Sequence, residues 1–168
     1  MIPVALLATT VVAAFAAPAG GGPLVPGVPV ETSDTNPFAS CPADGSGTNF
    51  ADSEVEPWID INPTDPDNIV GTYQQDRYSN GGAKSNAAAV SFDAGETWAQ
   101  VAIPNLTRCS PGGGPYERAT DPWLSFGPDG TLHHMSLVLD PDPPGGGFGD
   151  NAMVYNRSTD GGLTWDPA

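Results

Sequence analysis

Two short segments of this chain gather side chains that could do chemistry. Ser91–Trp98 holds an Asp, a Glu and a Thr within one tight turn, which taken alone would suggest an active site. The same order of residue types returns 67 residues later in Ser158–Trp165, with the shared pattern Ser-x-Asp-x-Gly-x-Thr-Trp. Because the pattern recurs, we interpret each Asp as a turn-closing acceptor for backbone N–H groups. Each Gly suits a positive φ and each Trp packs. The residues of these two turns are Ser91, Asp93, Gly95, Thr97, Trp98, Ser158, Asp160, Gly162, Thr164 and Trp165.

The segments around the turns predict strands. In the first half we expect strands over 57–61, 69–75, 87–92 and 98–103, which together form a four-stranded antiparallel meander. Glu56–Pro63 and Asp121–Pro128 share the order acid, Pro, Trp, aliphatic, polar, apolar, turn residue, Pro. This second landmark indicates that the meander repeats, with later strands near 131–139 and 152–155. A repeated four-stranded unit is typical of β-propeller blades, here about 56–103 and 121–168. We therefore expect an all-β fold with two blades, the second incomplete, and a fragment of a propeller whose missing blades would be needed for closure.

The charge composition argues against some classes of binding partner. The chain has 20 acidic residues against 5 Lys and Arg, a net charge of −15. Nucleic acids and anionic membranes require a basic surface, so neither is an expected partner. The 21 Gly and 19 Pro residues fit an all-β chain with many turns better than a helical one.

The first half also contains features of an exported protein. Residues 1–16 resemble a signal peptide with cleavage before Ala17, which predicts a secreted, extracellular protein without a membrane span; a buried N-terminal strand is the alternative. Residues 17–52 are rich in Pro and Gly and are expected to form an extended or disordered arm. In an oxidising compartment Cys41 and Cys109 could form a disulfide, although two unrelated thiols are the alternative.

His133 and His134 are neighbours in a strand and point to opposite faces, so we expect no metal site there.

The two turns match the pattern known as the Asp box, or BNR repeat. From about residue 52 onward, with Glu54–Trp98 and Glu117–Trp123, the chain resembles the sialidase superfamily of β-propellers and secreted proteins described as exo-α-sialidase-like. This resemblance implies a glycoside hydrolase that acts on sialylated or related glycans. Asp boxes occur on propellers of many functions, so a non-catalytic propeller that binds glycan or protein is the alternative, and a structural or non-functional remnant is a third possibility.

Blade topology places the loop before the first strand and the loop between the second and third strands at the end opposite the Asp boxes. The charged residues expected at that end are Glu56, Asp76, Arg77, Glu117, Arg118 and Asp121. The resemblance implies catalytic roles for Asp76 and Arg77. Substrate binding would fall to Arg77, Glu117, Arg118, Asp121 and Glu56. Arginine suits a sugar carboxylate because it stays charged and donates two parallel hydrogen bonds.

The chain also departs from the family pattern. Gln75 stands where a Glu is usual, Val55 where an Arg is usual, and residues 79–83 contain no Asp for the acid–base role. We therefore expect no hydrolysis by this chain alone. Glu117 and Arg118 could instead form only a local salt bridge. Two Asp-Pro-Asp turns at 65–68 and 140–142 could hold Ca²⁺, but their spacing is not that of a known calcium loop, and solvated turns are the alternative.

Overall fold

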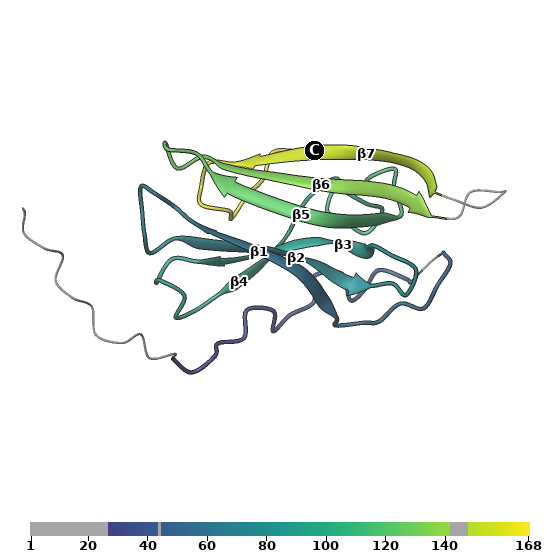
Figure 1. The fold of residues 1–168 in the computed structure, drawn as a ribbon, viewed down its shortest axis with the longest axis horizontal. Helices are drawn as coiled ribbons and strands as arrows, with labels where there is room; N and C mark the ends of the chain where they lie inside the picture. Colours follow the sequence, from purple (N-terminus) through teal and green to yellow (C-terminus); the bar gives the residue numbers. More distant parts are fainter. Residues whose placement is uncertain (1–26, 44, 142–147) are drawn as a thin grey trace, which may run out of the picture.

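The computed structural model describes residues 27–43, 45–141 and 148–168 as an all-β protein (Figure 1). The expected signal peptide at 1–16 and the start of the arm lie outside the described residues. The strands are β1 (Glu54–Ile61), β2 (Ile69–Arg77), β3 (Ala83–Ser91), β4 (Ala99–Ala102), β5 (Arg118–Phe126), β6 (Leu132–Pro141) and β7 (Phe148–Ser158). No described residue lies in a helix.

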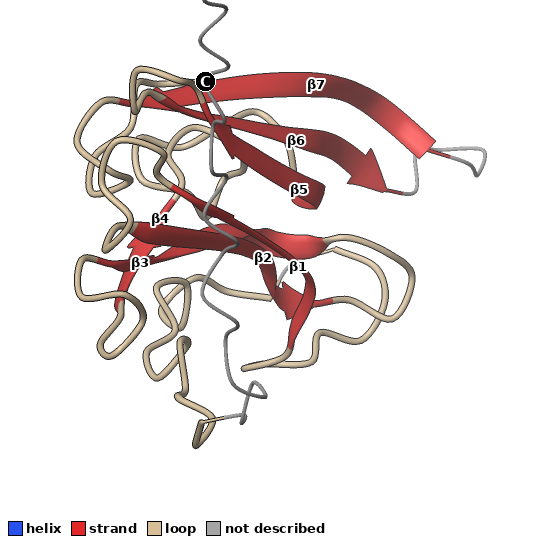
Figure 2. Ribbon diagram, turned by 60° about the vertical axis from the view of Figure 1, so that its left-hand side comes forward, coloured by secondary structure: helices blue, strands red, loops and turns tan. Residues whose placement is uncertain are grey.

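The seven strands are antiparallel and run in the order β1-β2-β3-β5-β6-β7, with β4 paired to β3. A single residue pair, Ala83 with Ala119, joins β3 to β5. Beyond that pair the strands separate into two layers, a first unit of β1–β4 and a second unit of β5–β7 (Figures 1 and 2). The described strands do not close into a ring. The expected meander of four strands is therefore present in the first unit, and three strands of the same order form the second.

The main core lies between the two layers. Alternate residues of each strand point into it, as expected for strands buried on one face. Its buried members are Val70, Ala88, Val90, Ile103, Leu106, Ala119, Leu124, Leu132 and Val138. A smaller cluster on the far side of the first unit consists of Phe38, Tyr73, Ala87 and Ala89. The first unit is thus buried on both faces, by the second unit on one side and by the N-terminal arm on the other (Figure 1).

The two units meet through equivalent positions of the repeat. Trp58 of β1 and Trp123 of β5 lie with ring centroids 6.2 Å apart. Asp60 of β1 accepts hydrogen bonds from the Ser125 hydroxyl at 3.2 Å and from the Phe126 N–H at 2.9 Å. The first strands of the two units therefore lie beside each other in the same direction, as neighbouring copies of one repeat would.

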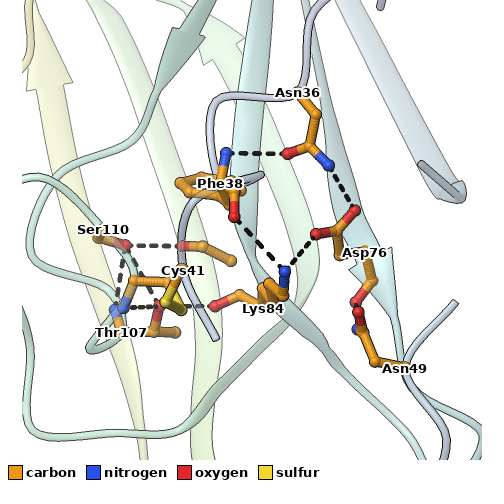
Figure 3. Close-up of a disulfide and its surroundings, with 10 residues drawn as sticks. Asn36, Phe38, Cys41, Asn49, Asp76, Lys84, Thr107 and Ser110 are labelled. Carbon is orange, nitrogen blue, oxygen red and sulfur yellow. Dashed lines mark hydrogen bonds and ion pairs between the residues drawn. A yellow bond between two sulfur atoms is a disulfide. The ribbon is translucent and has the colours of Figure 1, made fainter. Parts of the chain in front are cut away.

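The arm is tied to the first unit at several points (Figure 3). Cys41 and Cys109 form a disulfide that joins the arm to the loop after β4. Phe38 is only 1 % exposed and fills the apolar cluster beneath β2 and β3. The Asn36 amide donates to Asp76 at 2.7 Å. Over its described residues, 27–43 and 45–53, the arm forms turns and an isolated bridge between Asn49 and Tyr78, and its packing gives it a defined path over the sheet.

Candidate functional site

The two Asp-box turns have the same internal hydrogen bonds. In the first turn, the Asp93 carboxylate accepts from the Thr97 N–H at 2.8 Å and from the Thr97 hydroxyl at 2.5 Å. In the second turn, Asp160 accepts from the N–H and hydroxyl of Thr164 at 2.9 and 2.5 Å. The hydroxyl of each Ser donates to the Asp at 2.8 Å and accepts the Gly N–H at 2.9 Å. Both Asp carboxylates therefore accept hydrogen bonds that close their own turns.

The glycine in the pattern has a geometric cause. Gly95 and Gly162 have φ values of 90° and 101°, a region that residues with a Cβ rarely adopt. A Cβ at Gly162 would also lie 3.1 Å from side-chain atoms of Val70 and Val90, so the second turn packs closely on the first unit. Asn68 strengthens this contact, since its amide donates at 3.1 Å to the carbonyls of Ser91 and Gly161, one in each turn.

At the opposite end, the structure brings together two of the predicted site residues, Glu56 and Asp121. Each lies in a β-bulge and has a positive φ, 55° and 47° respectively. A bulge re-aims side chains at the edge of a sheet. The Asp121 N–H donates to the Glu56 carboxylate at 3.3 Å. Both residues are exposed, so this end of β1 and β5 presents a pair of carboxylates to solvent.

Two polar residues that sequence reasoning missed hold this pair. The Gln74 amide of β2 donates to the Glu56 carboxylate and, at 3.0 Å, to the Thr120 hydroxyl. The Thr120 hydroxyl donates to Asp121 at 3.3 Å. Gln74 begins the polar run that ends β2, and only its complete burial shows that it serves the site. We call Glu56, Gln74, Thr120 and Asp121 the carboxylate edge.

Asp76 lies apart from this edge. It is fully buried and forms an ion pair with Lys84 at 2.9 Å (Figure 3). Burial opposes ionisation of Asp76, but hydrogen bonds from Lys84, the Asp52 N–H and Asn36, together with the Lys84 charge, lower its pKa below the usual range. A carboxylate in this position fastens the arm to the sheet and has no open path to a ligand.

Arg118 is buried as well. Its guanidinium lies 3.4 Å from the ring centroid of Tyr78 and donates to the carbonyl oxygens of Ser46 at 2.6 Å and Gly81 at 3.0 Å. These contacts join the arm and the β2–β3 loop to the start of β5. Its neighbour Glu117 forms a salt bridge with the exposed Arg108 at 2.9 Å.

Arg77 ends β2 in a half-buried position, and its N–H donates to the Ser53 hydroxyl at 3.2 Å. The six predicted site residues therefore fall into three places: the carboxylate edge, the buried Asp76 and Arg118 beneath the arm, and the surface at Arg77 and Glu117. Whether any of them binds a glycan stays a prediction. Chemically, the carboxylate edge can accept hydrogen bonds from hydroxyl groups, and charge-assisted hydrogen bonds of this kind are among the stronger ones.

Within the described ranges, no group of three or more His, Cys, Asp or Glu side chains is arranged to hold a metal ion. The same ranges contain no helix that is long and apolar enough to cross a membrane. Comparison with known proteins adds no relative, since no family model, curated protein or solved structure matches the chain.

Proposed function

We propose that the chain contributes to a secreted, sialidase-like glycoside hydrolase of the Asp-box β-propeller kind and binds sialylated or related glycans at the carboxylate edge. The observation that carries this proposal is the pairing of Glu56 and Asp121, which two equivalent bulges present side by side. In the first step of such a reaction the sugar must be bound before it can be cleaved, and carboxylates suit sugar hydroxyl groups as hydrogen-bond acceptors.

Support for the propeller comes from the repeat. The two units have matching Asp-box hydrogen bonds, and their first strands meet through equivalent residues. In a propeller, the end of the blades opposite the Asp boxes surrounds the channel entrance. The carboxylate edge lies at that end of β1 and β5.

The burial of Asp76 and Arg118 favours a second candidate, a propeller that binds glycan or protein without catalysis. Neither side chain can reach a substrate while the arm covers it. Of the two predicted arginines, Arg118 is buried, and half-buried Arg77 is the one that a substrate could still contact. We therefore expect this chain to bind a sialoside without hydrolysing it.

Binding is tested by titrating 3′-sialyllactose into the chain and following calorimetry or amide shifts. Glu56→Gln and Asp121→Asn should each weaken binding about tenfold, the cost of roughly one charge-assisted hydrogen bond. Glu96→Gln is the matched control, because it removes an exposed carboxylate at the Asp-box end and should leave affinity unchanged. Absence of binding, or an equal effect of Glu96→Gln, would sink the proposal.

Hydrolysis is measured separately with a fluorogenic sialoside. Binding without turnover supports the non-catalytic candidate for this chain. Turnover that disappears in Asp76→Asn would show that the arm uncovers Asp76 in solution and would favour the hydrolase.

A further inference from the structure

The far face of the second unit carries a patch of large apolar side chains. Trp123, Met135, Met153 and Tyr155 are 41 %, 38 %, 58 % and 47 % exposed. The strand register places Trp123, Met135 and Tyr155 in one row, with Leu137 and Met153 in the next. We call these five residues the open face. In Figure 1 the first unit and the described arm lie on the other side of the second unit.

The repeat shows what this kind of face does. In the first unit the row equivalent to Trp123, Met135 and Tyr155 consists of Trp58, Thr72 and Ala88. Thr72 and Ala88 are fully buried against the second unit. The corresponding face of the first unit is therefore a sheet-packing surface, and the open face continues the same stacking direction. Its larger, more apolar side chains would gain free energy from burial against another sheet.

Charge restricts the surfaces that can cover the open face. The chain carries a net charge of −15, yet segments 123–126, 132–137 and 153–158 contain no Asp or Glu. Most approaches by a second copy would press carboxylates against apolar side chains, which is costly. The open face of that second copy avoids this cost because it is apolar and lacks acidic groups.

At the other end of the stack, the far face of the first unit is covered over β2 and β3, while Ile59 and Ile61 of β1 stay 61 % and 53 % exposed. The arm places Phe38 on the far face of the first unit, and the Cys41–Cys109 disulfide holds it there. A copy therefore cannot add its first unit to the open face of another in the way that the two units stack within one chain. A face that pairs with itself gives a closed two-fold dimer.

From these observations we infer that the oxidised chain forms a dimer in which the open faces of two copies pack against each other. The inference does not rest on the proposed glycan binding, because the carboxylate edge lies at the bulged ends of β1 and β5. Trp123, Met135 and Tyr155 form the middle of the interface, with Leu137 and Met153 beside them.

Sedimentation equilibrium of the oxidised full chain over a range of concentrations tests the dimer. The wild-type chain should reach twice the chain mass, and Met153→Glu should raise the dissociation constant at least ~100-fold, because a dimer would bury two unpaired carboxylates. Ile59→Glu is the matched control, since Ile59 is a strand residue that is 61 % exposed but lies outside the open face. It should leave the dissociation constant unchanged.

Circular dichroism and thermal unfolding establish that each variant is folded. Met153→Gln serves as a second, uncharged variant and should weaken the dimer by a smaller factor. A monomeric wild-type chain, or equal effects of the Met153 and Ile59 substitutions, would overturn the inference. Sialyllactose binding by a monomer would leave the proposed function standing while the dimer fails.

Discussion

Packing between the two units changes the pKa of His134. It is fully buried, its Nε2 lies 3.3 Å from the Thr72 hydroxyl of the first unit, and its ring meets that of Trp165 edge-on at 5.7 Å. Burial lowers the pKa of His134 to about 4, and a hydrogen bond with Asn156 opposes this only in part. Thr72, Trp165 and Asn156 carry no charge that could stabilise a protonated ring, so the folded protein keeps His134 neutral down to about pH 4.

This burial predicts a loss of stability in mild acid. Above pH 6.5 the imidazole is neutral in both folded and unfolded chains and favours neither. As the pH falls from 6.5 to about 4, His134 becomes protonated in the unfolded chain but stays neutral in the folded chain. The free energy of unfolding therefore falls by up to about 3 kcal/mol. Urea denaturation at pH 7.5, 6, 5 and 4.5 measures the slope.

The neighbouring histidine supplies the control. His133 lies on the open side of β6 and contacts the Tyr155 hydroxyl at 2.7 Å. His133→Gln should keep the acid-dependent slope, whereas His134→Gln should flatten it, whatever its absolute stability. The carboxyls of Asp76, Asp93, Asp129 and Asp160 have lowered pKa values and so lose their stabilising charge only below this window. An unchanged slope in His134→Gln would contradict the assignment.

Among the structural elements, the Asp-box turn is the one whose role is most directly measurable. Asp160 accepts three hydrogen bonds that close the turn after β7, two from Thr164 and one from Ser158. Asp160→Ala should lower the free energy of unfolding by about 1–2 kcal/mol, discounted for the partial exposure of the carboxylate. Urea denaturation at pH 7.5 measures it. Leu163→Ala, a change at a 47 % exposed side chain of the same turn, should have an effect within about 0.5 kcal/mol. Equal effects would mean that the turn does not depend on its carboxylate.

The strands and turns show what the sequence could predict. Alternating apolar residues and the repeated turn pattern placed the strands in the correct order, because both signals are local. The ends of the strands differ from the predicted ones. β2 continues through Arg77 and β5 begins at Arg118, where charged residues suggested loops. These positions become strand because their backbones pair with neighbouring strands, Arg77 with Ala83 of β3 and Arg118 with Leu139 of β6.

The candidate site was less predictable because it depends on contacts between segments that are far apart in the sequence. Glu56 and Asp121 could be linked by their place in the repeat, but not the bulges that expose them or the Gln74 amide that joins them. Arg118 has the chemistry of a substrate-binding residue, yet its carbonyl partner in Ser46 is 72 residues away along the chain. Long-range burial of this kind leaves no local pattern in the sequence.

At the scale of the whole molecule, the two outer faces of the stack differ, because the arm covers much of one and leaves the other exposed. The arm closes the first unit with Phe38 and with Asn36, which is bound to Asp76, and the disulfide joins residues 68 positions apart. The second unit ends the stack with exposed Trp123, Met135, Met153 and Tyr155. The arm therefore both stabilises the first unit and limits which faces can associate.

Replacing both cysteines, Cys41→Ser with Cys109→Ser, tests this role of the arm. Loss of a cross-link over this chain length should cost about 2–4 kcal/mol of stability, and the arm should leave the first unit in a fraction of molecules. The uncovered face of Tyr73, Ala87 and Ala89 could then pack on the open face of another copy, repeating the stacking within the chain. Unlike a self-pairing contact, this head-to-tail contact can continue and gives larger assemblies.

Light scattering should therefore show species heavier than the dimer for the double serine variant but not for the oxidised wild-type chain. Adding Met153→Glu to the serine variant should abolish them, since head-to-tail contacts also need the open face. Heavy species that persist with Met153→Glu would indicate non-specific aggregation of a destabilised chain. A serine variant that keeps the mass of the oxidised protein would show that Phe38 and Asn36 hold the arm without the disulfide.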